Sequence, residues 1–210
     1  MTYNTCLVSS LYYEVSGSMI SMNIESTKFV KGIVQDDTIM NDGIPQIAFI
    51  GRSNVGKSSL INALTKTKLS RISSTAGRTQ EINFFLINNS VYFVDLPGYG
   101  FAKVSNTKRS ELSNLINSYL FNDVWTQKKV VLIIDINVGM TDKDIKMYND
   151  LKKHGKDIIV ALSKVDKIKQ SDFYKNIREI EKTTGDHKLF QFSSEKKIGI
   201  QELVDEIFVA

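Results

Sequence analysis

The segment Gly51-Arg-Ser-Asn-Val-Gly-Lys-Ser58 constrains this chain most, because its spacing of glycines, lysine and serine is that of a phosphate-binding loop. Residues 46–50 before it have the composition of a short buried strand, and residues 59–64 after it begin an amphipathic helix. Gly51 and Gly56 allow a tight turn, and backbone N–H groups at the start of the helix can then hold phosphate oxygens. The strand–loop–helix context therefore predicts that the chain binds a nucleotide.

Two side chains of this loop have individual roles in the prediction. Lys57 places a positive charge at the β- and γ-phosphates, which also makes it a candidate catalytic residue, and Ser58 offers a hydroxyl to Mg²⁺. The loop residues expected to contact the nucleotide are Gly51, Arg52, Ser53, Asn54, Val55, Gly56, Lys57, Ser58 and Ser59.

Composition narrows the class of protein. The chain has 210 residues, 42% of them hydrophobic, which is enough for one domain with a sizeable core. Its one cysteine, Cys6, cannot form an internal disulfide, and no apolar run approaches the roughly 18 residues of a membrane span. No Lys or Arg precedes Lys28, so we expect no secretory signal and a cytoplasmic protein.

The first residues differ from the rest of the chain. Residues 1–21 are rich in Ser, Thr and Tyr and show no hydrophobic period, so we expect a disordered, dispensable extension. A short strand or helix packed on the domain edge is the alternative. Residues 22–210 are then the nucleotide-binding domain, which opens with a lead-in segment at 23–41.

Helical and strand patterns alternate along this domain. Residues 82–87 and 91–94 predict a β-hairpin across the turn at 88–90. Near-continuous apolar strands that alternate with helices indicate a mostly parallel sheet covered on both faces. We therefore predict a three-layer α/β P-loop NTPase fold with one antiparallel strand. The remaining predicted strands are 130–135, 158–162 and 188–192, and the helices are 107–119, 142–154, 173–182 and 200–208.

Three later segments point to a guanine nucleotide. Asp95 ends a predicted strand, where a carboxylate can hold Mg²⁺ through water, and Gly98 can bring its N–H close to a γ-phosphate. Ser163-Lys-Val-Asp166 also ends a strand, and ligands of such sheets bind outside the carboxyl ends of the strands. Asp166 can accept hydrogens from N1 and N2 of guanine, whereas adenine has no matching donor pair. Phe192-Ser-Ser194 can add backbone donors near the guanine oxygen. A P-loop kinase or ATPase is the disfavoured alternative.

Two blocks carry a closer resemblance, Arg71-Ile-Ser-Ser-Thr-Ala-Gly-Arg-Thr-Gln80 and Val94-Asp-Leu-Pro-Gly-Tyr-Gly-Phe-Ala-Lys-Val-Ser105. Over about residues 23–208 the chain resembles the EngB (YihA/YsxC) family, of the TrmE-Era-EngA-EngB-septin-like class of P-loop GTPases. The resemblance implies Mg²⁺-dependent GTP hydrolysis and a switch role in large ribosomal subunit assembly, with a need in cell division and septation. It implies GTP and GDP as ligands, and precursor rRNA and ribosomal proteins as partners. We expect a monomer that contacts no membrane.

The resemblance also assigns site residues. Thr79 would complete the Mg²⁺ shell beside Ser58, with Asp95 acting through water, which makes Thr79 a second catalytic candidate. The nucleotide contacts implied beyond the first loop are Gly77, Arg78, Thr79, Gln80, Glu81, Asp95, Leu96, Pro97, Gly98, Ser163, Lys164, Val165, Asp166, Phe192, Ser193 and Ser194.

Several positions depart from the pattern of the family. Ala76 stands where Pro is usual, which predicts a less stiff first switch. Ser163 stands where Thr is usual, and this change is expected to be mild. Asn137 and Val138 replace a usual Arg and His, so the role of that basic pair does not carry over to this chain.

Two further residues bear on the rate of hydrolysis. Tyr99 stands where Ras-like proteins carry the Gln that orients the attacking water, so we expect slow hydrolysis until a partner orders the switches. Asn54 is a candidate potassium ligand, as in relatives that hold K⁺ beside the phosphates, which makes K⁺ a second candidate cofactor. The alternative is that Asn54 only stiffens the loop.

The charge balance leaves the partner open. Lys plus Arg is 27 against 23 Asp plus Glu, a formal charge of +4, which fits RNA contact and a solvated surface equally. A nucleotide-gated RNA or protein adaptor with incidental hydrolysis is the alternative function. The basic residues that would contact rRNA are Lys66, Lys68, Arg71, Arg78, Lys103, Lys108 and Arg109.

Overall fold

Strands and helices alternate along the chain as the apolar patterns predict. The structure, a computed structural model, describes residues 23–67, 81–100, 105–122 and 127–209. In chain order its elements are β1 (Thr27–Ile33), η1 (Thr38–Asn41), β2 (Gln46–Gly51), α1 (Lys57–Thr65), β3 (Ile82–Ile87), β4 (Val91–Asp95), α3 (Asn106–Phe121), β5 (Lys129–Asp135), α4 (Asp142–Lys153), β6 (Ile158–Ser163), α5 (Gln170–Thr184), β7 (Leu189–Gln191) and α6 (Ile200–Phe208).

These strands form one sheet in the order β1-β3-β4-β2-β5-β6-β7. β2 pairs in parallel with β4 and β5, and the parallel pairing continues through β6 to β7. β3 runs antiparallel to both of its neighbours, β1 and β4. β3 is therefore the one reversed strand, and the predicted fold class is confirmed.

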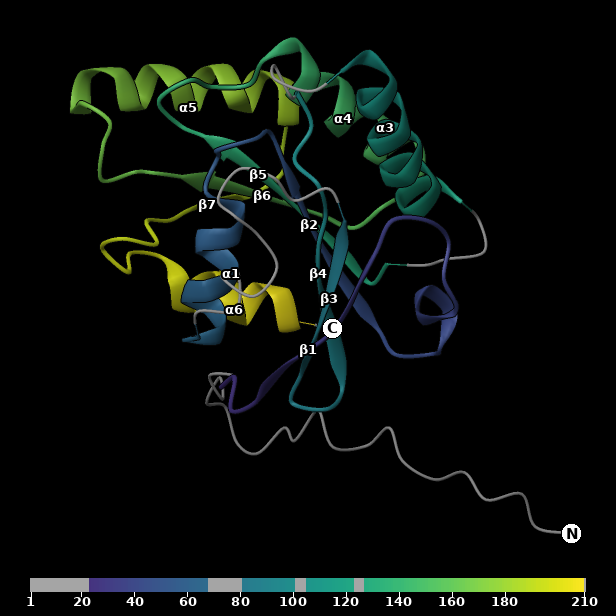
Figure 1. The fold of residues 1–210 in the computed structure, drawn as a ribbon. Helices are drawn as coiled ribbons and strands as arrows, with labels where there is room; N and C mark the ends of the chain where they lie inside the picture. Colours follow the sequence, from purple (N-terminus) through teal and green to yellow (C-terminus); the bar gives the residue numbers. More distant parts are fainter. Residues whose placement is uncertain (1–22, 68–80, 101–104, 123–126, 210) are drawn as a thin grey trace, which may run out of the picture.

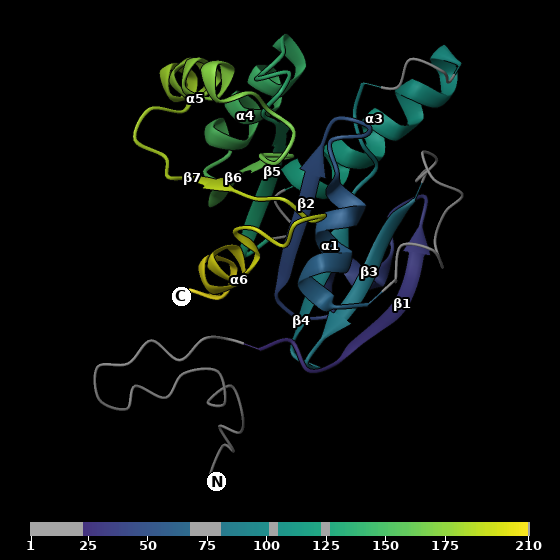
Figure 2. The ribbon, with the colours of Figure 1, turned by 90° about the vertical axis from the view of Figure 1, so that its left-hand side faces the viewer.

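Helices cover both faces of the sheet (Figure 1). α1 and α6 lie on one face, and α3, α4 and α5 lie on the other, as the turned view in Figure 2 shows. On the first face Phe49 packs with Leu60 and Leu203, all fully buried. On the second face Tyr119 and Tyr148 are the largest fully buried side chains. Burial of the strands on both faces explains why their sequences are apolar throughout rather than alternating.

The lead-in segment differs from its prediction, because it contains an edge strand. β1 pairs with β3, but the register shifts between Phe29 and Lys31. Such an irregularity breaks the two-residue period that marks a strand in a sequence. The short 3-10 helix η1 follows, with Asp37 as its cap. Only the sheet pairing reveals this strand.

Some predictions fall on residues that the structure does not describe. The extension expected at 1–21 and the switch residues 68–80 lie outside the described residues. Within the described parts of the chain, no helix is both long and apolar enough to cross a membrane.

Candidate nucleotide-binding site

The candidate site lies at one edge of the sheet, where the predicted segments follow parallel strands. The loop at 51–58 follows β2, Asp95 ends β4, Ser163 ends β6 and Phe192 follows β7. Because β2, β4, β6 and β7 run in the same direction, all four segments emerge at the same edge. Segments that are far apart in the sequence are thereby brought together.

The loop at 51–58 has a backbone suited to anions. Gly56 has φ of +99° and caps α1, and no side chain caps the first turn of this helix, which also lacks acidic residues. The N–H groups of that turn are therefore free to bind a ligand, and the positive end of the helix dipole lies at the same place. Gly51 is also required, since a Cβ there would lie 2.6 Å from the carbonyl oxygen of Ile133. The arrangement fits phosphate binding.

Lys57, Ser58 and Asp95 meet at the start of α1. The buried Lys57 ammonium forms an ion pair with the Asp95 carboxylate, and Ser58 Oγ lies 3.4 Å from Asp95 Oδ2. A hydroxyl and a carboxylate are the hard oxygen donors that Mg²⁺ prefers. Among the described residues there is no cluster of three or more His, Cys, Asp or Glu side chains. These residues fit an ion held mostly by phosphates and water.

The segment after Asp95 is hydrogen-bonded to the phosphate loop. Ser53 N–H donates to Tyr99 O at 3.1 Å, and Tyr99 N–H donates to Gly51 O at 3.2 Å. Gly98 packs so closely that a Cβ there would lie 3.0 Å from Ser53 N. The absence of a side chain at Gly98 is therefore what permits the approach.

Tyr99 turns toward α4. Its Oη donates to Asp144 Oδ1 at 2.7 Å, and Arg52 Nε forms an ion pair with Asp144 Oδ2 at 2.9 Å. Burial raises the pKa of the Tyr99 hydroxyl well above its usual value, and the neighbouring Asp144 charge adds to this shift. Asp144 also closes a capping box with Thr141 at the start of α4. A wholly buried carboxylate thus joins three segments.

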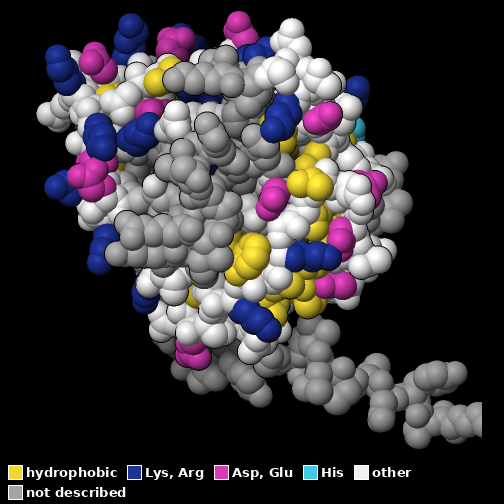
Figure 3. Space-filling model, in the orientation of Figure 1, with side chains coloured by type: hydrophobic (Ala, Val, Ile, Leu, Met, Phe, Trp, Pro, Cys, Tyr) yellow, Lys and Arg dark blue, Asp and Glu magenta, His cyan; other side chains and the backbone are white. Residues whose placement is uncertain are grey.

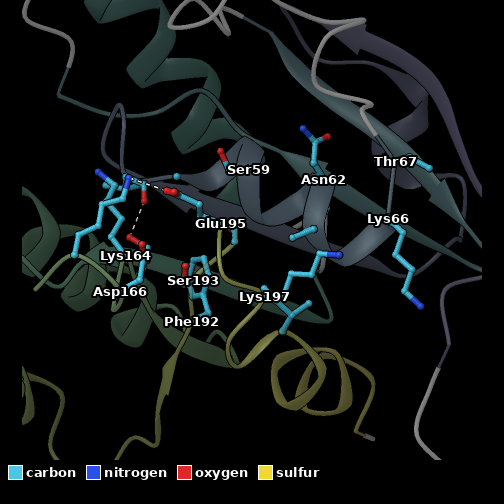
Figure 4. Close-up of a pocket in the computed structure, with 17 residues that line it drawn as sticks. Ser59, Asn62, Lys66, Thr67, Lys164, Asp166, Phe192, Ser193, Glu195 and Lys197 are labelled. Carbon is cyan, nitrogen blue, oxygen red and sulfur yellow. Dashed lines mark hydrogen bonds and ion pairs between the residues drawn. The ribbon is translucent and has the colours of Figure 1, made fainter.

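The second half of the site is a cavity of about 690 Å³ between α1 and the loops after β6 and β7. In Figure 4, Asp166, Ser193 and Phe192 lie at one end of this cavity, and Lys66 and Thr67 lie at the other. A hydrogen bond from Ser193 lowers the pKa of the Asp166 carboxyl. Asp166 is therefore an ionised acceptor, which suits the N1 and N2 hydrogens of guanine.

The two halves of the site are tied together by side chains. Ser163 Oγ donates to Val55 O at 2.6 Å. Lys164 Nζ donates to Asn54 O at 2.8 Å and pairs with Asp135 Oδ2 at 2.6 Å. Asn137 in turn donates its backbone N–H and its Nδ2 to Asp135 Oδ1. The loop expected to hold the base is therefore fixed to the loop expected to hold the phosphates.

Not every predicted residue faces the site. Leu96 is fully buried in the core, so only its backbone is available to a ligand, and the partly buried Val165 side chain packs against the same core. Glu81 lines a smaller hollow with Val34 and Lys108. The predicted contacts at Gly77, Arg78, Thr79 and Gln80 lie outside the described residues.

Asp135 and Asp144 are not among the site residues predicted from the sequence. Asp135 ends a buried strand, as Asp95 does, and this position was an available signal. Asp144 follows Thr141 at capping-box spacing, but nothing in the sequence links it to Arg52 or Tyr99.

Comparison with known proteins agrees with this geometry. A family model described as a 50S ribosome-binding GTPase matches residues 46–164. The fold and the site thus define a GTPase of the P-loop class. A probable GTP-binding protein EngB from Clostridium perfringens is 44% identical over 191 residues, covering 89% of this chain and 96% of the relative. The corresponding protein of Acholeplasma laidlawii is 41% identical over 189 residues, covering 89% of this chain and 98% of the relative. The chain belongs to the EngB family of GTP-binding proteins.

Solved structures lead to the same family. A crystal structure of a probable EngB GTP-binding protein superposes with a TM-score of 0.59 at 26% identity, over 78% of this chain and 96% of that one. A crystal structure of Era with MgGDPNP and nucleotides 1506–1542 of 16S ribosomal RNA gives a TM-score of 0.64 at 29% identity. That match covers 79% of this chain and 56% of Era. The resemblance to the EngB family is confirmed.

Proposed function

We propose that this GTPase is a slow, Mg²⁺-dependent switch that acts in assembly of the large ribosomal subunit, with a consequent need in division and septation. The main support for nucleotide binding is the pair of hydrogen bonds from the Ser163 and Lys164 side chains to the backbone of the phosphate loop. It joins a guanine-compatible cavity to a cluster that contains Lys57 and Asp95. We place this switch in the cytoplasm and expect it to act as a monomer.

In this proposal each end of the nucleotide has its own group of residues. The first turn of α1 and the Lys57 ammonium hold the phosphates. Asp166 accepts from the guanine edge, and Ser193 and Ser194 line the same cavity. Mg²⁺, the metal typical of the family, would be held by Ser58 directly and by Asp95 through water, and would neutralise phosphate charge. Thr79 remains a proposed further ligand.

Hydrolysis is attack of a water oxygen on the γ-phosphorus, as the bond from that phosphorus to the β–γ bridging oxygen breaks. Negative charge grows on the bridging oxygen and the β-phosphate, where Lys57 and the α1 N–H groups can stabilise it. Tyr99 Oη donates its hydrogen to Asp144, so that hydrogen is not available to orient the attacking water. We therefore expect slow turnover until a partner reorders the segment after Asp95.

The ribosomal part of the proposal draws on relatives and on surface charge. The matching family model is described as ribosome-binding, and the Era structure contains ribosomal RNA. Lys66, which lines the cavity, and Lys108 and Arg109 in the first turn of α3 are exposed, so phosphates of rRNA could reach them. On the face in Figure 3, the basic side chains along α5 are interspersed with acidic ones. The other basic residues predicted to contact rRNA, Lys68, Arg71, Arg78 and Lys103, lie outside the described residues.

The nucleotide part is tested by competition and turnover. Purified protein should bind GTP in preference to ATP and hydrolyse it slowly, and Lys57→Ala should abolish turnover. Equal affinity for ATP would remove the guanine assignment. Replacing K⁺ by Na⁺ tests Asn54, because a potassium ligand predicts slower hydrolysis in Na⁺, and equal rates leave Asn54 as a loop residue.

The ribosomal part is tested with pre-ribosomal particles. We expect the GTP-loaded protein to sediment with large-subunit precursors at low salt, to dissociate as salt rises, and to hydrolyse GTP faster when bound. Binding that leaves hydrolysis unchanged would favour the adaptor function. Absence of binding at low salt would refute the ribosomal role.

A further inference from the structure

Asn83, on β3, is a buried amide that the chain itself leaves unsatisfied. Its side chain is 1% exposed, and neither Oδ1 nor Nδ2 has a hydrogen-bond partner in the described parts of the chain. A buried amide without partners destabilises a fold, so such groups in native proteins usually have a hydrogen-bond partner, which can be an ordered water. Asn83 is not among the residues assigned above to the nucleotide-binding site.

The sheet register places Asn83 beside Asp95. Asn83 pairs with Asp95 across β3 and β4, and Asp95 pairs with Phe49 on β2. Directly paired residues on antiparallel strands point to the same face, with Cβ atoms about 4.5–5.5 Å apart. The Asp95 carboxylate contacts Lys57 and Ser58 of α1, so this face is the α1 face. The amide of Asn83 therefore projects next to the candidate metal-binding carboxylate.

Asn83 also interrupts an apolar row at the point nearest to Asp95. Phe85 and Ile87, which share its face, belong to the core under α1. On the other side lies Gly32, where an added Cβ would be 3.0 Å from Asn83 Oδ1 and 2.4 Å from Glu81 Oε2. The glycine thus leaves room for two oxygen acceptors. A buried polar position beside a carboxylate can hold ordered water.

We propose that Asn83 positions a water molecule in the hydration shell of the Mg²⁺ ion that enters with the nucleotide. This inference rests on the proposed Mg²⁺-GTP function. Mg²⁺ keeps several of its waters in such sites, and a metal-bound water donates both of its hydrogens. Asp95 supplies one acceptor, and the amide oxygen of Asn83 supplies the other once the amide rotates from Gly32 on β1 toward Asp95 on β4. Asn83 does not touch the reacting atoms, so it is a positioning residue.

The test measures release of a fluorescent GDP analogue during Mg²⁺ titration of the full chain and its variants. Asn83→Leu keeps the approximate volume but removes both polar atoms, and Asn83→Ala serves if leucine does not fold. We expect the apparent Mg²⁺ affinity to fall about tenfold, in the range seen for residues that support metal ligands indirectly. Asn83→Asp, which keeps an acceptor oxygen, should stay within about threefold of the parent. With EDTA, all variants should release GDP at the parent rate.

A stability measurement distinguishes this role from a structural one. Leucine removes an unsatisfied buried amide, so the unfolding midpoint in EDTA without nucleotide should be unchanged or higher for Asn83→Leu. Phe85→Leu, on the same strand and face, is the matched control for packing and should lower that midpoint without changing Mg²⁺ affinity. An Mg²⁺ affinity within twofold of the parent for Asn83→Leu, or faster GDP release in EDTA, would overturn the inference. If the parent itself shows no Mg²⁺ dependence of GDP release, the proposed function fails first.

Discussion

Replacing Asp144 by alanine should destabilise this protein more than any exposed acidic substitution on the same helix. The Asp144 carboxylate is fully buried and accepts from the Tyr99 hydroxyl, and it pairs with the Arg52 guanidinium at 2.9 Å. The same carboxylate accepts from the Thr141 N–H and hydroxyl at the start of α4. One substitution therefore removes a buried ion pair, a helix cap and a hydrogen bond.

The magnitude follows from these contacts. Removing one partner of a buried ion pair costs about 3–5 kcal/mol, and the lower end applies because the Arg52 side chain keeps 21% exposure and can regain solvent. Loss of the cap adds about 1 kcal/mol. We therefore expect a loss of about 4 kcal/mol in the free energy of unfolding. For a chain of this size that corresponds to a fall in melting temperature on the order of 10 °C.

Urea denaturation followed by circular dichroism measures this loss directly. Asp142→Ala is the matched control, since Asp142 is an exposed acidic residue in the first turn of the same helix. Its loss should cost only about 0.3–1 kcal/mol through the helix dipole. If Asp144→Ala is no less stable than Asp142→Ala, the link from the phosphate loop through Asp144 to Tyr99 contributes nothing, and the reasoning is refuted.

Three other predictions concern the nucleotide itself. Asp166→Asn should weaken GTP binding by about 100-fold and improve binding of xanthosine triphosphate, because the amide can donate to the oxygen at position 2 of xanthine. A competition assay between the two nucleotides measures this change. If the preference is unchanged, Asp166 does not bind the base. The hydrogen bond from Ser193 lowers the pKa of Asp166, so its carboxylate should lose its charge, and the protein its GDP affinity, only as pH falls below the usual Asp range. Ser193→Ala should move that loss to higher pH in a fluorescence titration, and coincident pH profiles would contradict the assignment. Gly98→Ala places a Cβ 3.0 Å from Ser53 N, which should move residues 95–98 away from the phosphate loop. We expect the affinity for GTP to fall by about tenfold more than the affinity for GDP. Equal losses of affinity for the two nucleotides would show that Gly98 does not contact the γ-phosphate.

The elements that the sequence predicted well are those with a strong local signal. Apolar runs marked β2, β5 and β6, and the glycine and lysine spacing of the loop at 51–58 placed the start of α1. β1 was missed because its register shift hides the strand period. Local patterns are sufficient where burial on both faces makes a strand apolar, and insufficient where an edge strand is irregular.

The residues of the candidate site also divide into those with a local sequence signal and those without one. Lys57, Asp95 and Asp166 could be named from motifs, because each follows a strand at a recognisable spacing. Asp144 and Asn83 could not be named, because their roles depend on which segments the sheet brings together. A carboxylate on α4 and an amide on β3 acquire neighbours only through packing and register.

The ion pair between Lys57 and Asp95 has a consequence for nucleotide exchange. A phosphate that reaches Lys57 competes with Asp95 for the same ammonium group, and the displaced carboxylate is then left to attract a cation. Binding of the phosphate would thus favour binding of the metal. When both leave, the ion pair between Lys57 and Asp95 can form again, which makes their release easier. Under the proposed function, exchange of nucleotide would also be an exchange of counter-ions, in which Asp95 alternates between the Lys57 ammonium and the hydration shell of a divalent metal.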